Sequence, residues 1–180
     1  MKLVLLSLLL ALNSVAADIQ VFFSPNGGCT KAVVENLNKA TKTVLVQAYS
    51  FTSAPIAKAL VDAEKRGVKV QVILDKSNWT EKYSSADFIQ RTGIPTFIDA
   101  KHNIAHNKII VIDSHTVLTG SFNFTKAAEK ENAENLLVIQ DADLAAKYTA
   151  NWEKHLGHCE QYTGAKGSLT DTGTKRKGIE

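Results

Sequence analysis

The sequence predicts an α/β domain in which helices cover both faces of a mixed β-sheet. In the first half of the chain, short β-branched and apolar segments alternate with segments of helical spacing. A hairpin pattern over residues 108–119 then adds antiparallel strands, which makes the sheet mixed. No linker and no internal repeat interrupts residues 18–156, so we expect a single domain.

The strands are expected where β-branched and apolar residues cluster between turn signals. They cover residues 19–23, 43–49, 68–74, 94–98, 108–112, 116–119 and 136–139. Pro95 should keep the fourth of these short, because proline has no N–H for the sheet ladder. The turn 113–115 should join the two strands of the hairpin.

Helices are expected over residues 29–40, 53–66, 78–91 and 141–156. Ser53 is a plausible N-cap with Pro55 in the first turn, and Gly67 ends that helix. Asp141 is expected to cap the last helix. The segment 78–91 is less apolar than the others, and Thr92-Gly93 closes it.

Residues 1–17 are expected to be a signal peptide rather than part of the fold. Lys2 gives a positive start, residues 3–12 are apolar, and residues 15–17 supply the small residues that a signal peptidase needs. An uncleaved membrane anchor is the weaker alternative, since a bilayer of about 30 Å needs about 20 apolar residues. We therefore expect a periplasmic or secreted protein with no stable membrane insertion after cleavage.

The charge balance is mildly basic. The formal charge of +3 becomes +2 when Lys2 is removed, which suits a polyanionic substrate without requiring one. The tail, residues 161–180, contains Lys175-Arg176-Lys177 and is expected to be basic and disordered. It either adds weak affinity for nucleic acid or has no role.

The sequence contains two cysteines, Cys29 and Cys159. An oxidising compartment would let them form a disulfide, and two unrelated thiols are an equally open alternative. His155, His158 and Cys159 also have a spacing that suits zinc. No acidic or cysteine partner near them completes a set, so no metal site is expected.

The residues that carry chemistry begin with His106 and Lys108. Side chains two apart on a strand point to the same side, and residues 109–112 form an apolar run typical of a buried strand. Histidine can accept a phosphoryl group or act as a general acid near neutral pH, and lysine can neutralise phosphate oxygens. This pair therefore indicates phosphodiester chemistry.

Further polar residues follow downstream. Ser121 and Asn123, again two apart, can donate hydrogen bonds to the same phosphate. Glu134 is the expected partner of the second ring nitrogen of His106. Asp113 lies an odd number of residues after Lys108, so we expect it to face away and to have a structural role in the hairpin.

The order His-x-Lys-x4-Asp, then Gly-Ser-x-Asn, resembles the signature of the phospholipase D superfamily. A small exported chain with one copy is similar to the EDTA-resistant bacterial endonucleases of that superfamily. Residues 47–52, 72–75 and 132–135 resemble the same subfamily, so we assign residues 18–160 to a phospholipase D-like nuclease domain. The resemblance implies a covalent phosphohistidine at His106 and no cofactor.

One copy of the motif supplies one nucleophile and no second histidine to protonate the leaving group. A two-fold homodimer would bring two copies of His106 to one composite site, and the resemblance implies the same arrangement. We therefore expect a metal-independent endonuclease that cuts DNA, and RNA as a second candidate, with little sequence preference.

Two other functions remain open at this point. A phospholipase D acting on phospholipid head groups would use the same chemistry, although the low aromatic content of 7% disfavours a lipid-binding surface. A non-catalytic nucleic-acid-binding protein in DNA uptake or transfer is the other alternative, and the full set of catalytic residues argues against it.

Overall fold

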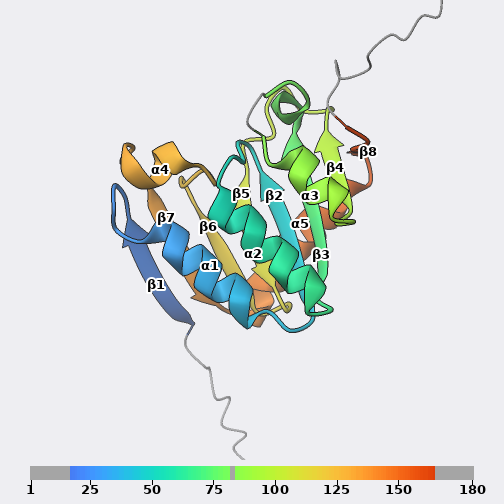
Figure 1. Ribbon diagram of the computed structural model, residues 1–180. Coiled ribbons are helices and arrows are strands. Elements are labelled where there is room, and N and C mark those ends of the chain that lie inside the picture. The colour runs from blue at the N-terminus through green and yellow to red at the C-terminus, as the bar shows by residue number, and fades with distance from the viewer. Residues whose placement is uncertain (1–16, 82–83, 165–180) are drawn as a thin grey trace, which may run out of the picture.

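A single mixed sheet of eight strands organises the molecule (Figure 1). The structure is a computed structural model that describes residues 17–81 and 84–164. The strands are β1 (Asp18–Phe23), β2 (Thr43–Ala48), β3 (Lys69–Asp75), β4 (Thr96–Asp99), β5 (Lys108–Ile112), β6 (Thr116–Gly120), β7 (Asn135–Gln140) and β8 (Glu160–Gln161). The helices are α1 (Cys29–Lys39), α2 (Ala54–Lys65), α3 (Ala86–Arg91), α4 (Lys126–Lys130) and α5 (Ala142–Leu156), with a 3-10 turn η1 (Lys76–Trp79).

The strand order is β1-β7-β6-β5-β2-β3-β4-β8. β3 pairs in parallel with both β2 and β4, as expected where helices alternate with strands. The other pairings are antiparallel, including the hairpin of β5 and β6. The prediction of an α/β fold with a mixed sheet is therefore confirmed.

Helices cover both faces of the sheet. In Figure 1, α1 and α2 lie side by side across the front of the sheet, and α5 lies behind it. On the front face, Leu37 and Leu60 reach the main core, where both are fully buried. On the other face, Ala145 of α5 packs against Val111 of β5. The indole Nε1 of Trp152 also donates a hydrogen bond of 2.9 Å to the carbonyl of Val46.

The expected helix over residues 78–91 is wrong in its first part. Residues 78–79 end the 3-10 turn η1, and among the described residues of the expected range only those of α3 are α-helical. The carboxylate of Asp75 accepts a hydrogen bond from the N–H of Ser77, and the amide of Asn78 donates to the carbonyls of Tyr49 and Asp75. Side chains that bond nearby backbone groups in this way compete with a regular helix.

Smaller corrections concern short elements. β4 begins at Thr96, after Pro95, rather than at residue 94. Two elements were not predicted: α4, whose N-cap Thr125 accepts from the N–H of Ala128, and β8, which pairs with β4. Because β8 and the buried Tyr162 belong to the fold, the described fold continues past the expected boundary at residue 160.

The possible disulfide is absent, and Cys29 and Cys159 are both free thiols. Cys29 begins α1, which packs near β1 and β7, whereas Cys159 follows α5 and precedes β8 at the opposite edge of the sheet. The expected signal peptide and the basic tail fall almost entirely on residues outside the described ranges. None of the described helices is long and apolar enough to cross a bilayer.

Candidate active site

His106 and Lys108 lie together where the loop 100–107 enters β5. His106 is exposed, whereas Lys108, the first residue of β5, is only 6% exposed. The ammonium Nζ of Lys108 donates a hydrogen bond of 2.8 Å to the backbone carbonyl of His106. The structure therefore places a solvent-accessible imidazole beside a buried cation.

The sequence-predicted residues share one cavity with this pair. The cavity has a volume of about 290 Å³. Its walls are His106, Lys108, Gly120, Ser121, Asn123 and Glu134. These side chains come from the start of β5, the segment after β6 and the segment before β7, three neighbouring strands of the sheet. We call this cavity the catalytic pocket, after the role that the sequence predicts for its residues.

Tyr49 braces both members of the pair, although the motif did not single it out. Its ring centroid lies 4.7 Å from that of His106, and the Nζ of Lys108 lies 5.2 Å from the Tyr49 centroid. The latter distance is within the range of a cation–π interaction. The N–H of Tyr49 also donates to the carbonyl of Asn107 at 2.8 Å, which connects the end of β2 to the loop 100–107.

Two opposing influences act on the charge of Lys108. Burial lowers its pKa below the ordinary lysine value, because a low-dielectric environment disfavours the charged form. The carboxylate of Glu134 acts in the opposite direction and raises this pKa. Glu134 thus helps to keep Lys108 cationic in the pocket.

The hydrogen bond expected between Glu134 and His106 is not formed in the described part of the chain. The carboxylate Oε1 of Glu134 instead accepts a hydrogen bond from the side-chain amide of Asn132 at 3.3 Å. The backbone N–H of Glu134 donates to the hydroxyl of Ser24 at 3.2 Å. Glu134 therefore lines the same pocket as His106 without a hydrogen bond to the imidazole.

Ser121 is held by Asn135, a residue that the sequence did not single out as catalytic. The Ser121 hydroxyl donates to Oδ1 of Asn135 at 3.0 Å and accepts from its backbone N–H at 3.1 Å. Asn123 is different, because its buried Oδ1 has no hydrogen-bond partner among the described residues. The Asn123 amide is therefore available to bind a ligand in the pocket. The Ser121 hydroxyl is instead bonded to Asn135 and fixes the wall of the pocket between β6 and β7.

Gly120 is needed for the same wall. Its φ is +150°, and a Cβ built on it would lie 2.2 Å from the carbonyl oxygen of Asn135. Real Cβ atoms do not approach backbone oxygens this closely, so β6 and the start of β7 can meet here only at a glycine. Steric crowding therefore explains why the Gly-Ser-x-Asn pattern begins with glycine.

Asp75 positions the loop that carries His106. It is buried at the end of β3, and its Oδ2 accepts a hydrogen bond of 2.7 Å from the N–H of Ala105. Its Oδ1 caps η1 at Ser77. The sequence offered one signal for this role, a carboxylate at the end of a buried strand. It could not identify Ala105 as the partner, because Ala105 lies 30 residues later in the chain.

Asp113 lies at the other end of β5 and does not line the catalytic pocket. Its carboxylate accepts hydrogen bonds from the N–H groups of Thr41, Lys42 and Thr43 and from the Thr41 hydroxyl. Although burial raises its pKa, these hydrogen bonds hold the pKa below the usual aspartate value. Asp113 thereby fixes the segment that leads into β2.

A second group of histidines lies outside the catalytic pocket. His155 and His158 do have an acidic partner, because Asp99 at the end of β4 lies against both, together with His102. The expectation that no acid completes their set is wrong, since the partner comes from 56 residues earlier in the chain. Cys159 is not a member of this group.

Comparison with known proteins gives the same family from sequence and from structure. The family model described as "Cardiolipin synthase, PLD-like domain" matches residues 33–156. A phospholipase D of Rickettsia conorii is 46% identical over 136 residues, which are 76% of this chain and 68% of that protein. A mitochondrial cardiolipin hydrolase of Xenopus laevis is 30% identical over 64% of this chain and 55% of that protein.

Two solved structures share the fold. Nuc of Salmonella typhimurium, a phospholipase D family member, superposes with a TM-score of 0.78 at 39% identity, covering 82% of this chain and 99% of Nuc. NucT of Helicobacter pylori gives a TM-score of 0.75 at 27% identity over 82% of this chain and 100% of NucT. With its His-x-Lys pair in the catalytic pocket, the chain belongs to the phospholipase D superfamily, as a hydrolase of phosphodiester bonds.

Proposed function

We propose that this protein is an exported, metal-independent endonuclease that hydrolyses DNA, and RNA as a second substrate, with little sequence preference. The observation that carries the proposal is the exposed imidazole of His106 beside the buried ammonium of Lys108 in one pocket. A buried lysine supplies positive charge to a phosphate without a metal ion, and phosphate contacts carry no base information.

The chemistry takes two displacements at phosphorus. A ring nitrogen of His106 attacks, the N–P bond forms, and the P–O bond to the leaving nucleotide breaks as that oxygen takes a proton from a general acid. Water then attacks the phosphohistidine and gives its proton to the general acid that the first step left deprotonated. The new P–O bond forms as the N–P bond breaks, which releases the phosphate product and the free imidazole. Lys108 and the Asn123 amide stabilise the phosphoryl oxygens in both steps.

The general acid is proposed to be His106 of a second copy in a two-fold homodimer. An apolar stripe on edge strand β1 supports this pairing, because Ile19, Val21 and Phe23 are 53%, 49% and 65% exposed. Phe23 pairs with Asn135, next to Glu134, so the stripe leads to the catalytic pocket. Native mass measurement should therefore give a dimer.

Lysines near the pocket favour a nucleic-acid substrate. A neighbouring cavity of about 620 Å³ is lined by Lys31, Lys126 and Lys130. Thr52, which also lines it, donates a backbone hydrogen bond to Phe124, the residue after Asn123. Lysine side chains next to a phosphodiesterase site would bind the phosphates that flank the scissile one.

A phospholipid substrate is the second candidate. The relatives named phospholipase D and cardiolipin hydrolase support it. So does Ile104, which is 59% exposed only two residues before His106 and could enter a lipid surface. The same active-site chemistry would then cleave a head group instead of a nucleic-acid backbone.

The deciding experiment offers both substrates to the purified protein in EDTA. We expect single-stranded DNA and plasmid to be cut, cardiolipin and phosphatidylcholine vesicles to be cut slowly or not at all, and His106→Ala to be inactive. His115→Ala, a change on the exposed hairpin turn, is the matched control. Faster turnover of lipid would establish the second candidate, and DNA binding without turnover of either substrate would indicate a non-catalytic binding protein.

A further inference from the structure

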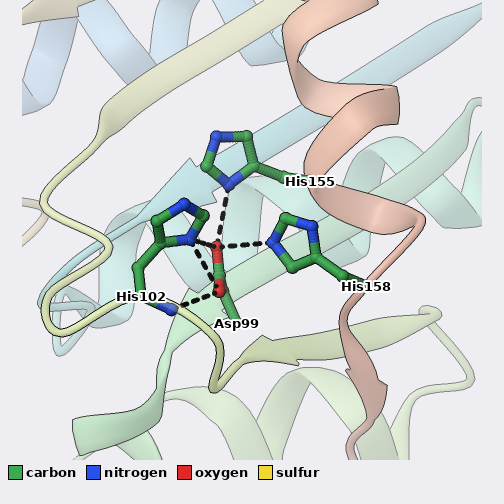
Figure 2. Close-up of side chains that lie close together, drawn as sticks. All are labelled: Asp99, His102, His155 and His158. Carbon is green, nitrogen blue, oxygen red and sulfur yellow. Dashed lines mark hydrogen bonds and ion pairs between the residues drawn. The ribbon is translucent and has the colours of Figure 1, made fainter.

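We propose that Asp99, His102, His155 and His158 form a structural binding site for a divalent metal ion of the zinc type (Figure 2). Each residue offers one ligand atom, and these atoms all lie within 4.8 Å of one another. The proposal does not depend on the proposed function, because none of the four residues lines the catalytic pocket.

The three imidazoles converge on one carboxylate oxygen. Nδ1 of His102 lies 2.9 Å, Nδ1 of His155 2.8 Å and Nε2 of His158 3.4 Å from Oδ2 of Asp99. A tetrahedral zinc site with ligand bonds of about 2.0–2.1 Å places neighbouring ligand atoms about 3.3 Å apart. The nitrogen–oxygen separations of 2.8–3.4 Å are close to this value, so an ion could enter once the imidazoles adjust around it.

The carboxylate is held so that Oδ2 faces all three imidazoles, while Oδ1 also lies 3.0 Å from Nδ1 of His102. Oδ1 of Asp99 accepts hydrogen bonds from the backbone N–H groups of Lys101 at 3.2 Å and His102 at 3.3 Å. Oδ2 is then directed toward the three rings, as Figure 2 shows. Backbone support of this kind orients a ligating carboxylate in metal sites.

Burial and crowding favour an ion over a network of hydrogen bonds. The Asp99 side chain is fully buried, and the side chains of His155 and His158 are 14% and 20% exposed. Three ring nitrogens compete for the lone pairs of one oxygen, and the ring centroids lie 4.9–5.4 Å apart. A central cation would instead accept one lone pair from each ring and from the carboxylate.

The ligand set identifies the ion by class. Three imidazoles and one carboxylate suit zinc and similar transition metals, whereas calcium and magnesium prefer sites built from oxygen. Four protein ligands fill a tetrahedral shell, so the site would be structural rather than catalytic.

The ion would connect two separate parts of the fold. Asp99 ends β4 and His102 lies in the loop that carries His106, while His155 lies in the last turn of α5 and His158 just after it. β8, which follows, has only two residues, so the ion would add a second connection between β4 and the segment after α5. Metal binding would stabilise the edge without taking part in hydrolysis.

The test titrates untagged, chelator-treated protein with Zn²⁺ and, separately, with Co²⁺. We expect one saturating Zn²⁺ per chain, an increase in the melting temperature, and the visible absorption of tetrahedral Co²⁺. His106→Ala should bind the ion like the wild type, which separates this site from the proposed catalytic residue. No saturable Zn²⁺ binding by the wild type would overturn the proposal.

Variants then locate the ion. His155→Gln and His102→Gln should each weaken Zn²⁺ binding by at least about 10–100-fold, the loss typical of removing even a group that supports a ligand. His102 is the gentler change, because its side chain is 44% exposed. His115→Gln, an exposed histidine elsewhere, should bind as the wild type does. Unchanged affinity in both ligand variants would overturn the assignment.

Discussion

The catalytic pocket and the Asp99 cluster both gather histidine, yet they surround it differently. In the pocket, one exposed imidazole lies beside a buried lysine and contacts the ring of Tyr49. In the cluster, three imidazoles turn their nitrogens toward one buried carboxylate. In the pocket, a ring nitrogen of His106 is accessible to an incoming phosphate. In the cluster, the ring nitrogens face inward, toward the carboxylate of Asp99.

On the two proposals, the neighbours of each histidine decide its chemistry. A nucleophile toward a phosphodiester needs access and nearby positive charge, which His106 has from Lys108. A metal ligand needs an anionic partner and fixed geometry, which His155 has from Asp99. The two regions are connected through the loop 100–107, which carries His102 toward one and His106 toward the other.

The largest effect should separate the regions by their loss of function. We expect His106→Ala to lower kcat/KM by more than about 10³-fold with an unchanged melting temperature, because it removes the nucleophile from an exposed position. His155→Gln should do the opposite, lowering the melting temperature while leaving the initial rate at low temperature nearly unchanged. Steady-state kinetics and thermal melts of both variants check this, and comparable rate losses would contradict the distinction.

Removing the charge of Lys108 should have the next largest effect. We expect Lys108→Met to lower kcat by about 10²–10³-fold, the loss typical of one group that stabilises transition-state charge. Its fold should survive, since methionine keeps the buried stem of the lysine. Lys58→Met, on an exposed turn of α2, is the matched control for nuclease assays. Equal rates for the two variants would exclude a role for Lys108 in the chemistry.

The sequence predicted the pair His106 and Lys108 because their relation is local. Lys108 begins β5, and His106 lies only two residues before it in the loop 100–107, so both side chains reach the same pocket. For Asp113, the odd offset from Lys108 predicted that the side chain faces away from the pocket. The five residues of β5 also separate Asp113 from the pocket by about 17 Å along the strand.

The rest of both sites depends on contacts that no local pattern contains. Ser121 is bonded to Asn135, 14 residues away, and Asp99 to His155, 56 residues away. β8 escapes periodicity because it has only two residues. Local sequence patterns therefore predict most strands of the sheet. The Asp99 cluster cannot be predicted in this way, because it forms only where β4 meets the end of α5.

A smaller effect should follow from the backbone contact that shapes the pocket. We expect Gly120→Ala to lower the free energy of unfolding by about 2–3 kcal/mol, because its methyl group would press on the carbonyl of Asn135. Gly67→Ala is the matched control, since Gly67 also has a positive φ but has open space around a Cβ. It should cost only about 1 kcal/mol. Denaturant unfolding measures both, and equal losses would contradict the steric explanation.

The smallest effect should appear in the pH dependence of hydrolysis. Lys108 supports phosphate binding while it is charged, so activity falls as pH rises through its pKa. Because burial lowers that pKa, the alkaline fall of kcat/KM should occur below the ordinary lysine value of about 10.4. Glu134 raises the pKa of Lys108, so Glu134→Gln should move the fall to still lower pH. His158→Gln, outside the pocket, should leave it unmoved, and a shift to higher pH in Glu134→Gln would show that Lys108 does not govern this limb.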